Sequence, residues 1–273
     1  MRGNRFVVGV LARDLALDAA AKPSASTELI PYERPEIGPL SSKSQATKLP
    51  RFQKLSAEAI AFSYAADRNS VFESLSFEIN AGETVGLVGP SGAGKSTLAD
   101  LLLGFLDPTA GRVLVNGCDL RGAHREWQFM VAYIPQQSYL IDDTLRRNVA
   151  LGVPDAEIED DKVRAALEDA QLGPLLRELS AGLDTKLGER GVRFSGGQRQ
   201  RVSIARALYH DREFLVLDEA TSALDEETER EIVETIRALA GKKTILLISH
   251  RESTLAVANR CITIKPKTFG KGA

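Results

Sequence analysis

The sequence of 273 residues has few cysteines, no surplus of either charge and no long apolar run. Its two cysteines, Cys118 and Cys261, have no metal-ligand spacing around them, and this favours a reduced, cytosolic compartment over a disulfide-stabilised secreted protein. The 35 basic and 37 acidic residues nearly cancel, whereas proteins that bind nucleic acid usually carry a basic excess. We therefore expect no nucleic-acid partner.

The sequence predicts no membrane-spanning helix. Its longest apolar runs, residues 6–12 and 101–106, are far shorter than the roughly 18 to 20 residues that cross a bilayer. Residues 6–12 follow two arginines and weakly resemble a secretory signal. We reject that interpretation because Arg13 and Asp14 end the run at the short limit of such segments.

The first 50 residues differ in composition from the rest of the chain. They hold five of the eleven prolines and serine clusters such as residues 41–44, with little periodic apolar surface to offset the entropy of ordering. We predict a linker or disordered tail over residues 1–54, a folded domain over residues 55–265 and a short tail over residues 266–273.

Beyond residue 55 the apolar pattern indicates an α/β fold. Alternation predicts antiparallel strands at residues 59–64 and 74–79, and a third at 112–115 before the turn signal Asn116-Gly117. A helical period between residues 156 and 179 places Val163, Ala166, Leu167 and Ala170 on one face. Farther on, helices at residues 197–210 and 226–239 alternate with strands at 214–217 and 244–248.

This order predicts a mainly parallel core sheet with helical cover, an antiparallel β subdomain and an inserted α-helical subdomain over about residues 137–200.

Residues 83–106 contain the motif around which the domain is organised. A short apolar strand runs into Gly-Pro-Ser-Gly-Ala-Gly-Lys-Ser-Thr and then into a helix. The glycines let backbone N–H groups surround phosphates, Lys95 would reach the β- and γ-phosphates, and the Ser96 hydroxyl would bind Mg²⁺. A merely tight turn would not need Lys-Ser after its last glycine. The predicted nucleotide-binding residues here are Gly89, Pro90, Ser91, Gly92, Ala93, Gly94, Lys95, Ser96 and Thr97.

Two further strands of the predicted sheet end on polar residues. Asp218 and Glu219 follow the apolar strand at residues 214–217, at the edge where ligands of parallel sheets bind. Asp218 suits the Mg²⁺ shell, and Glu219 could polarise the water that attacks the γ-phosphate. Alternatively, the pair is solvated and caps the next helix. His250 ends the strand at 244–248 and either has a structural role or holds the γ-phosphate or Glu219 in place.

A second anion site is predicted at the start of the helix at residues 197–210. Ser195 is placed to cap this helix, whose free N–H groups favour an anion. The alternative is a helix that is simply capped, but two such helix starts in one chain suggest that a nucleotide is held from both sides.

With these residues in place, the chain resembles the nucleotide-binding domain of ABC transporters over about residues 55–265, which implies the P-loop NTPase fold. The most specific element is the segment Phe-Ser-Gly-Gly-Gln, which resembles the family's LSGGQ signature with Phe194 in place of leucine. The signature residues that the resemblance assigns to the nucleotide are Ser195, Gly196, Gly197 and Gln198.

The resemblance implies three more site residues. Tyr64 matches the aromatic residue that stacks on adenine, with a core tyrosine as the alternative. Gln136 matches the glutamine that touches Mg²⁺ and couples the site to membrane domains, unless it is an ordinary loop residue. Residues 222–225 match the loop through which paired domains communicate, and Asp225 would otherwise only cap a helix.

The resemblance also implies an ATPase with ATP and Mg²⁺ as cofactors, catalytic roles for Lys95, Gln136, Glu219 and His250, and metal contacts from Ser96, Gln136 and Asp218. The family's working unit is a head-to-tail pair, so we expect a homodimer or a pairing with a similar domain. Transmembrane domains, fused or separate, would hold it at the cytoplasmic face of a membrane.

Two loops resemble those of exporters. Residues 185–191 are similar to the T-x-x-G-E-R-G loop, in which Glu189 would face the coupling helices, and residues 139–149 are similar to domains of lipid-linked oligosaccharide flippases. The chain departs from the family in lacking fused membrane helices, in having Glu252 where leucine is common, and in ending early. Residues 1–50 are therefore a remnant of a connection to a membrane domain, a boundary of the chain, or a new tail.

We expect an ATPase that powers export or lipid flipping across a membrane. The alternatives are a soluble ABC-type ATPase and a truncated remnant that only binds nucleotide. Soluble relatives usually carry a long coiled coil between the two motifs, whereas only about 100 residues separate Lys95 from Ser195 here.

Overall fold

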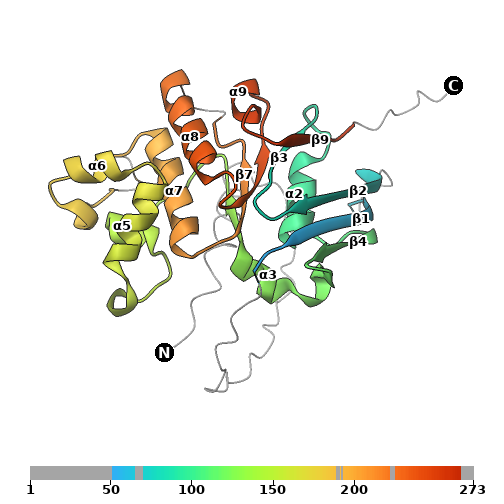
Figure 1. Cartoon of the computed structure of the whole chain (residues 1–273), viewed down its shortest axis with the longest axis horizontal. Coiled ribbons are helices and arrows are strands. Elements are labelled where there is room, and N and C mark those ends of the chain that lie inside the picture. The colour runs from blue at the N-terminus through green and yellow to red at the C-terminus, as the bar shows by residue number, and fades with distance from the viewer. Residues whose placement is uncertain (1–50, 65–69, 189–190, 192, 222–224, 266–273) are drawn as a thin grey trace, which may run out of the picture.

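A computed structural model of the chain describes residues 51–64, 70–188, 191, 193–221 and 225–265. These residues form an antiparallel and a parallel sheet with helix α2 (Lys95–Leu103) between them, and further helices cover the other face of the parallel sheet (Figure 1). The α/β class, with a parallel core, an antiparallel part and a helical part, is confirmed.

The antiparallel sheet has the strand order β2-β1-β4-β5. Its first strand begins earlier than predicted, and Phe52 already packs in the core. Ala59 has a φ of 46° at a register shift, so the buried positions change phase between Ala57 and Ile60. This bulge breaks the alternation on which the sequence prediction depended. The strands are β1 (Lys54–Phe62), β2 (Phe72–Asn80), β4 (Ala110–Val115) and β5 (Cys118–Asp119).

The turn between β4 and β5 follows the sequence signal. Asn116 and Gly117 both have positive φ, of 51° and 81°, as a two-residue type I′ hairpin turn requires. The Asn116 side chain also accepts hydrogen bonds from the backbone N–H groups of Gln53 and Lys54, at 2.8 and 3.1 Å. The turn therefore fixes the start of β1 as well as the hairpin.

The parallel sheet has the order β6-β7-β8-β3-β9, and its central strands are buried on both faces. Burial on both faces explains their continuous apolar runs. In the register of the sheet, Ile248 on β8 lies between Leu87 on β3 and Asp218 on β7. The strands are β3 (Thr84–Val88), β6 (Val131–Ile134), β7 (Phe214–Asp218), β8 (Thr244–Ile248) and β9 (Arg260–Thr263).

The helices follow the predicted periods closely. Helix α2 is shorter than its apolar pattern, because Gly104 adopts the left-handed conformation and ends it before Phe105. The helical region predicted from residue 156 contains α5, whose predicted apolar face is buried. The other helices are α3 (His124–Met130), α4 (Leu145–Val149), α5 (Asp160–Asp169), α6 (Gly173–Glu178), α7 (Gly196–Tyr209), α8 (Glu226–Leu239) and α9 (Glu252–Leu255).

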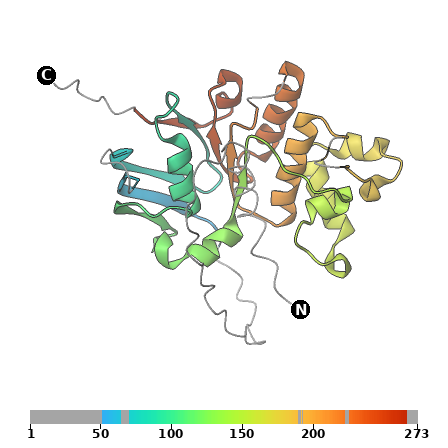
Figure 2. The same cartoon turned by 180° about the vertical axis from the view of Figure 1, so that it is seen from behind.

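The parallel sheet lies between two hydrophobic clusters and contributes buried residues to both. On β7, Phe214 and Val216 face the cluster formed with the antiparallel sheet and α2. The alternate residues, Leu215 and Leu217, face the cluster formed with α4, α5, α7 and α8. Figure 2 shows these two halves on either side of the sheet.

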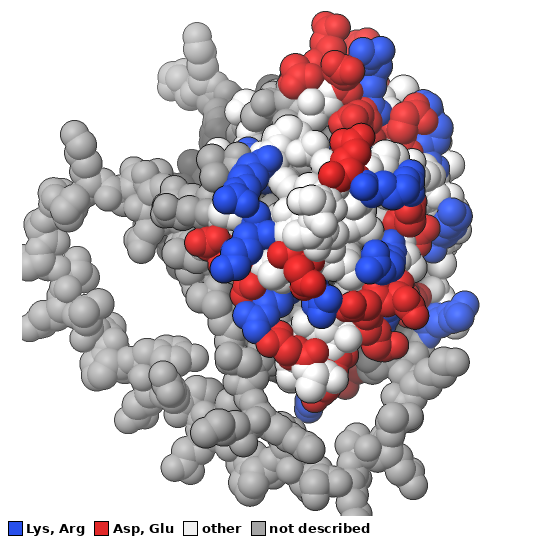
Figure 3. Space-filling view, turned by 90° about the vertical axis from the view of Figure 1, so that its left-hand side faces the viewer, with Lys and Arg blue, Asp and Glu red and all other residues white. Residues whose placement is uncertain are grey.

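The surface on the α5 and α6 side carries charges of both signs, interspersed around uncharged residues (Figure 3). Within the described parts of the chain, no helix combines the length and the apolar character that crossing a membrane requires.

Candidate nucleotide-binding site

The carboxyl ends of four parallel strands bring most of the predicted site residues to one edge of the sheet. The phosphate loop follows β3, Gln136 follows β6, Glu219 follows β7 and His250 lies just after β8. The register places the ends of these strands side by side, since Ile134 pairs with Leu217 and Asp218 pairs with Ile248. This edge is where ligands bind in open α/β sheets.

The phosphate loop encloses the ammonium group of Lys95. Lys95 is buried, and its Nζ donates to the carbonyl oxygens of Gly89 and Pro90 at 2.8 and 3.1 Å. Gly92 and Gly94 have positive φ, and a Cβ on Gly94 would lie 2.5 Å from the Val71 side chain. A glycine is therefore required at position 94 by conformation and by packing.

The first turn of α2 has donors to offer an anion. Its N-cap is Gly94, and no side chain among the described residues caps the free N–H groups. Ser96 is exposed at this helix start. Uncapped N–H groups, the helix dipole and the Lys95 ammonium group together form a cradle that fits phosphates.

Tyr64 lies beside this cradle and is not a core residue. Its side chain is 46% exposed, and its hydroxyl lies 3.0 Å from the Thr97 Oγ1 atom in a hydrogen bond. The ring packs edge-on against Phe62, with centroids 4.9 Å apart. An exposed face next to the phosphate loop suits stacking on a base, which stays a prediction.

Asp218 ends β7 in a partly buried position next to the Tyr133 hydroxyl. That hydroxyl donates to Asp218 Oδ2 at 2.8 Å. Burial raises the pKa of Asp218, the Tyr133 hydrogen bond opposes this rise, and the neighbouring charge of Glu219 adds to it. The oxygens of Asp218, Ser96 and Gln136 are of the type that Mg²⁺ prefers.

Glu219 and His250 form a pair at the same edge. The His250 Nε2 atom lies 3.5 Å from Glu219 Oε1, and both side chains are partly exposed. Glu219 has a φ of 46°, and its N–H donates to the Ile248 carbonyl oxygen at 2.8 Å. A non-glycine residue in this conformation is held there at a cost in strain, which is frequent at functional sites.

The signature segment is a capped helix start on the other face of the sheet. The Gln198 N–H donates to Ser195 Oγ at 3.2 Å, and the Ser195 N–H donates to Gln198 Oε1 at 2.9 Å. Phe194, in the place of the family's leucine, is buried in the core of the helical half. Helices α2 and α7 pack against opposite faces of the sheet, so one chain does not bring its two predicted anion sites together.

Asp225 caps α8, which is the alternative role that the sequence analysis considered for this residue. Its carboxylate accepts hydrogen bonds from the Thr228 N–H and hydroxyl groups, both at 2.9 Å. The backbone bond is the larger cause that lowers the pKa of Asp225, followed by the hydroxyl bond. The predicted contact residues 222–224 and Glu189 lie outside the described residues, so their roles stay predictions.

Gln200 connects the signature helix to the loop that carries Gln136, and the sequence analysis did not identify it. The Gln200 side chain is only 2% exposed; its Nε2 donates to the Pro135 carbonyl oxygen at 3.1 Å, and Ser138 Oγ donates to its Oε1 at 2.6 Å. The signal that could have identified Gln200 is an amide residue on the buried face of an amphipathic helix.

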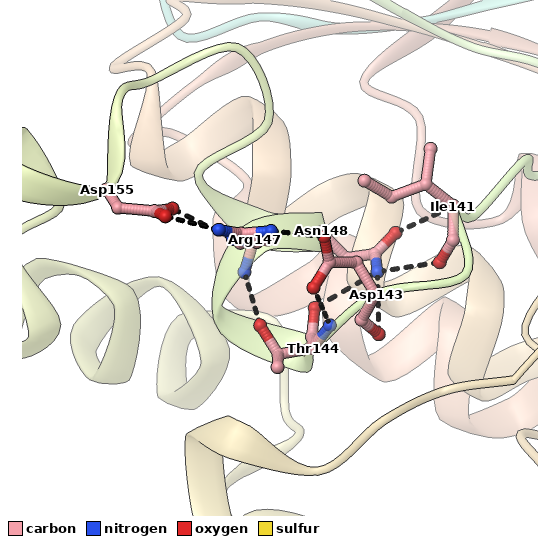
Figure 4. Close-up of polar contacts among 6 residues, drawn as sticks. All are labelled: Ile141, Asp143, Thr144, Arg147, Asn148 and Asp155. Carbon is pink, nitrogen blue, oxygen red and sulfur yellow. Dashed lines mark hydrogen bonds and ion pairs between the residues drawn. The ribbon is translucent and has the colours of Figure 1, made fainter.

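Asn148 holds the exporter-like segment that follows Gln136 (Figure 4). It is fully buried; its Oδ1 accepts from the Ile141 N–H at 2.9 Å, and its Nδ2 donates to the carbonyl oxygens of Ile141 and Thr144, both at 3.0 Å. Arg147 forms ion pairs with Asp143 and Asp155 on the outer side. The Leu145 N–H donates to the Thr185 carbonyl oxygen at 2.9 Å, so residues 185–187 are fixed to the same segment.

Comparisons with known proteins show which family this chain is similar to. A family model described as ABC transporter matches residues 72–222. An ATP-dependent lipid A-core flippase of Ralstonia nicotianae is 43% identical over 210 residues, which cover 76% of this chain and 36% of that protein. An ATM1-type heavy metal exporter of Novosphingobium aromaticivorans is 42% identical over 206 residues, covering 75% of this chain and 33% of that protein.

A solved structure of a bacterial Atm1-family ABC exporter with ATP bound has a similar fold, with a TM-score of 0.69 and 39% identity. The match covers 80% of this chain and 38% of that one. The chain thus spans little more than a third of the length of the curated relatives that it matches.

Proposed function

This chain belongs to the ABC transporter family, as an ATP-binding domain with the P-loop NTPase fold, and on this premise we propose that it hydrolyses Mg²⁺-ATP to power export or lipid flipping across a membrane. The observation that carries the proposal is the meeting of the Lys95 cradle, Asp218 and the Glu219–His250 pair at one edge of the sheet.

Each residue at this edge has a role that its position supports. The backbone N–H groups of residues 89–97 and the Lys95 ammonium group bind the phosphates, and Tyr64 stacks on the base. Ser96, Gln136 and Asp218 hold Mg²⁺, which supplies charge stabilisation for phosphoryl transfer when it is bound. Glu219 accepts the proton of the attacking water, and His250 holds Glu219 or the γ-phosphate in place.

The signature residues act on a nucleotide bound to another copy. Ser195, Gly196, Gly197 and Gln198 begin α7 on the other side of the sheet from α2, so a second domain must provide the partner for each half-site. We infer a head-to-tail dimer with two ATP molecules between the phosphate loop of one copy and the signature of the other. Asp225 lies at the loop through which the two copies communicate.

The relatives support a membrane partner for this chain. The relatives named above are a flippase and exporters, and the chain covers about a third of each. We infer transmembrane domains, fused or separate, that contact the Gln136 and Glu189 loops from the cytoplasmic face of a membrane. The contacts around α4 support this role. Asn148 holds residues 141–144, which come after Gln136 in the chain, and hydrogen bonds of Asp143 and Leu145 hold residues 185–187, which precede Glu189.

The test compares the chain with its Glu219→Gln variant. We expect the chain to hydrolyse ATP with Mg²⁺, and the variant to lose roughly 100-fold or more in turnover, since an amide cannot accept the proton. The variant should still bind ATP and elute as an ATP-dependent dimer. Glu226→Gln, which alters an exposed acid on α8, is the matched control and should hydrolyse normally. Unchanged turnover in Glu219→Gln would remove Glu219 as the base.

A further inference from the structure

Glu229 is a buried carboxylate that the proposed chemistry does not use. It lies in the first turns of α8, and its side chain is only 9% exposed. Its two oxygens accept hydrogen bonds from Arg251 Nη1 and from Ser253 Oγ. Both donors belong to the short segment that directly follows His250.

The same segment is fixed at two other points. The Arg251 N–H donates to Ser249 Oγ at 3.0 Å, on the other side of His250. Thr254 is buried, and its hydroxyl lies 3.0 Å from that of Thr221, in a hydrogen bond. Thr221 follows Glu219 by two residues. The chain before His250 is held to Glu219 by the Ile248 carbonyl oxygen, and the chain after it is held by the contacts of Thr254 and Glu229.

Burial makes the Glu229 contact energetically different from an exposed ion pair on the same helix. Glu234 and Arg237 are 62% and 58% exposed, and a pair of that kind contributes little to stability. In contrast, loss of the Glu229 carboxylate removes a buried acceptor that joins α8 to both Arg251 and Ser253, so the segment after His250 is held less firmly.

We propose that Glu229 is a positioning residue, which acts through Arg251 and Ser253 to hold His250 against Glu219. The inference rests on the proposed ATPase function and assigns it a residue outside the nucleotide-binding motifs. Glu229 contacts Arg251 and Ser253 and lies outside the nucleotide-binding motifs, so we expect its effect to pass through the 3.5 Å contact between His250 and Glu219. A shift of about 1 Å in such a group costs up to roughly 100-fold in rate.

The test combines kinetics with a spectrum of the histidine rings. In Glu229→Ala we expect kcat to fall by roughly ten- to 100-fold, while KM for ATP changes less than about twofold. Glu229→Gln keeps one acceptor oxygen for Arg251, and its NH2 group can donate to the Ser253 hydroxyl, so this variant should recover part of the rate. Glu234→Ala, on the same helix, is the matched control and should behave like the unmodified chain.

The chain has three histidines, His124, His210 and His250, so the ring signals of isotope-labelled histidine can be assigned with one variant, His250→Ala. In Glu229→Ala the His250 signal should shift, while those of His124 and His210 stay in place. If Glu229→Ala does not fold, Ser253→Ala, which changes an exposed residue, takes its place.

Two results would overturn the inference. One is an unchanged His250 signal in a folded Glu229 variant, and the other is a loss of rate in Glu229→Ala that adds in full to the loss in His250→Ala, because residues that act as a unit are not additive. Absence of hydrolysis in the unmodified chain would instead contradict the proposed function, and the inference with it. Hydrolysis with an unmoved His250 signal contradicts the inference alone.

Discussion

Gly197 on α7 faces Thr228 on α8 so closely that a Cβ atom at position 197 would lie 2.1 Å from the Thr228 Cγ2 atom. The second glycine of the signature is therefore required by the contact between these two helices, independently of any nucleotide. The same Thr228 side chain donates to Asp225, so the contact also borders the cap of α8.

We predict that Gly197→Ala destabilises the chain, although alanine is the better helix former by about 1 kcal/mol in an open position. The added methyl group must displace α8, and overpacking of this kind costs about 1–3 kcal/mol. Thr228→Ser removes the Cγ2 atom and keeps the hydroxyl that donates to Asp225. Urea unfolding should therefore show that Thr228→Ser rescues Gly197→Ala, and additive losses would contradict the steric account.

Lys95→Ala should weaken ATP binding by roughly ten- to 100-fold, because a charged hydrogen bond contributes about 1.5–3 kcal/mol. Lys95 also holds the Gly89 and Pro90 carbonyl oxygens, so the variant loses order in the loop as well as charge. Titration calorimetry with ATP measures the effect. Lys54→Ala, which removes a surface pair with Glu78, should bind as the unmodified chain does.

Tyr133→Phe should make hydrolysis more sensitive to acid. The Tyr133 hydrogen bond lowers the pKa of Asp218 against the effect of burial, so its loss raises that pKa further. Because Mg²⁺ binds the ionised carboxylate, the acid limb of the pH–rate profile should move to higher pH, with no change on the alkaline side. Tyr139→Phe alters an exposed tyrosine and serves as the control. An unmoved acid limb would argue against Asp218 as a metal ligand.

His210 makes the stability of the fold depend on pH. Burial, reinforced by the charge of Arg212, lowers the pKa of His210 to about 4, although the Leu151 carbonyl oxygen 3.0 Å from its Nε2 opposes the shift. The unfolded chain takes up this proton near pH 6.5 and the folded chain only near pH 4, so stability is lost as the pH falls between them.

His210→Gln should remove that dependence. The difference in unfolding free energy between pH 7 and pH 4.5 should be smaller in the variant than in the unmodified chain by on the order of 2 kcal/mol, as measured by urea unfolding at both pH values. His124→Gln provides the comparison for a second histidine. An equal loss of stability on acidification in the His210 variant would contradict the assignment.

The sequence predicted those parts of the fold whose signals are local. The strands β7 and β8 and helix α8 lie within one residue of their predicted bounds, because continuous apolar runs and a strong helical period leave few alternatives. The start of β1 was missed because the bulge at Ala59 reverses the alternation. Phe52 packs in the core three residues before the predicted boundary of the domain.

The candidate site likewise contains residues that the sequence predicted and residues that it did not. Lys95, Asp218 and Glu219 belong to motifs whose spacing has a chemical reason, and the parallel register brings them to one edge. Glu229, Gln200 and Asn148 were not predicted, because a polar residue on a helix is normally solvated, and only for Gln200 does its place on the buried face of an amphipathic helix give a sequence signal. Only the tertiary contacts of these three residues show that each is buried and hydrogen-bonded to a loop of the site.

Since alternate residues of β7 face two separate hydrophobic clusters, we expect the described part of the chain to open as two cooperative units on either side of the parallel sheet. Opening of the helical unit exposes Leu215 and Leu217 while Phe214 and Val216 remain packed on the other side. Amide hydrogen exchange should then report two groups of protection, one for the α5–α7 unit and one for the α2 unit, with the slowest exchange in β7 and β8. The proposed ATP site lies at one edge of the parallel sheet, and both units pack against this sheet. A bound nucleotide should therefore slow amide exchange in both units at once.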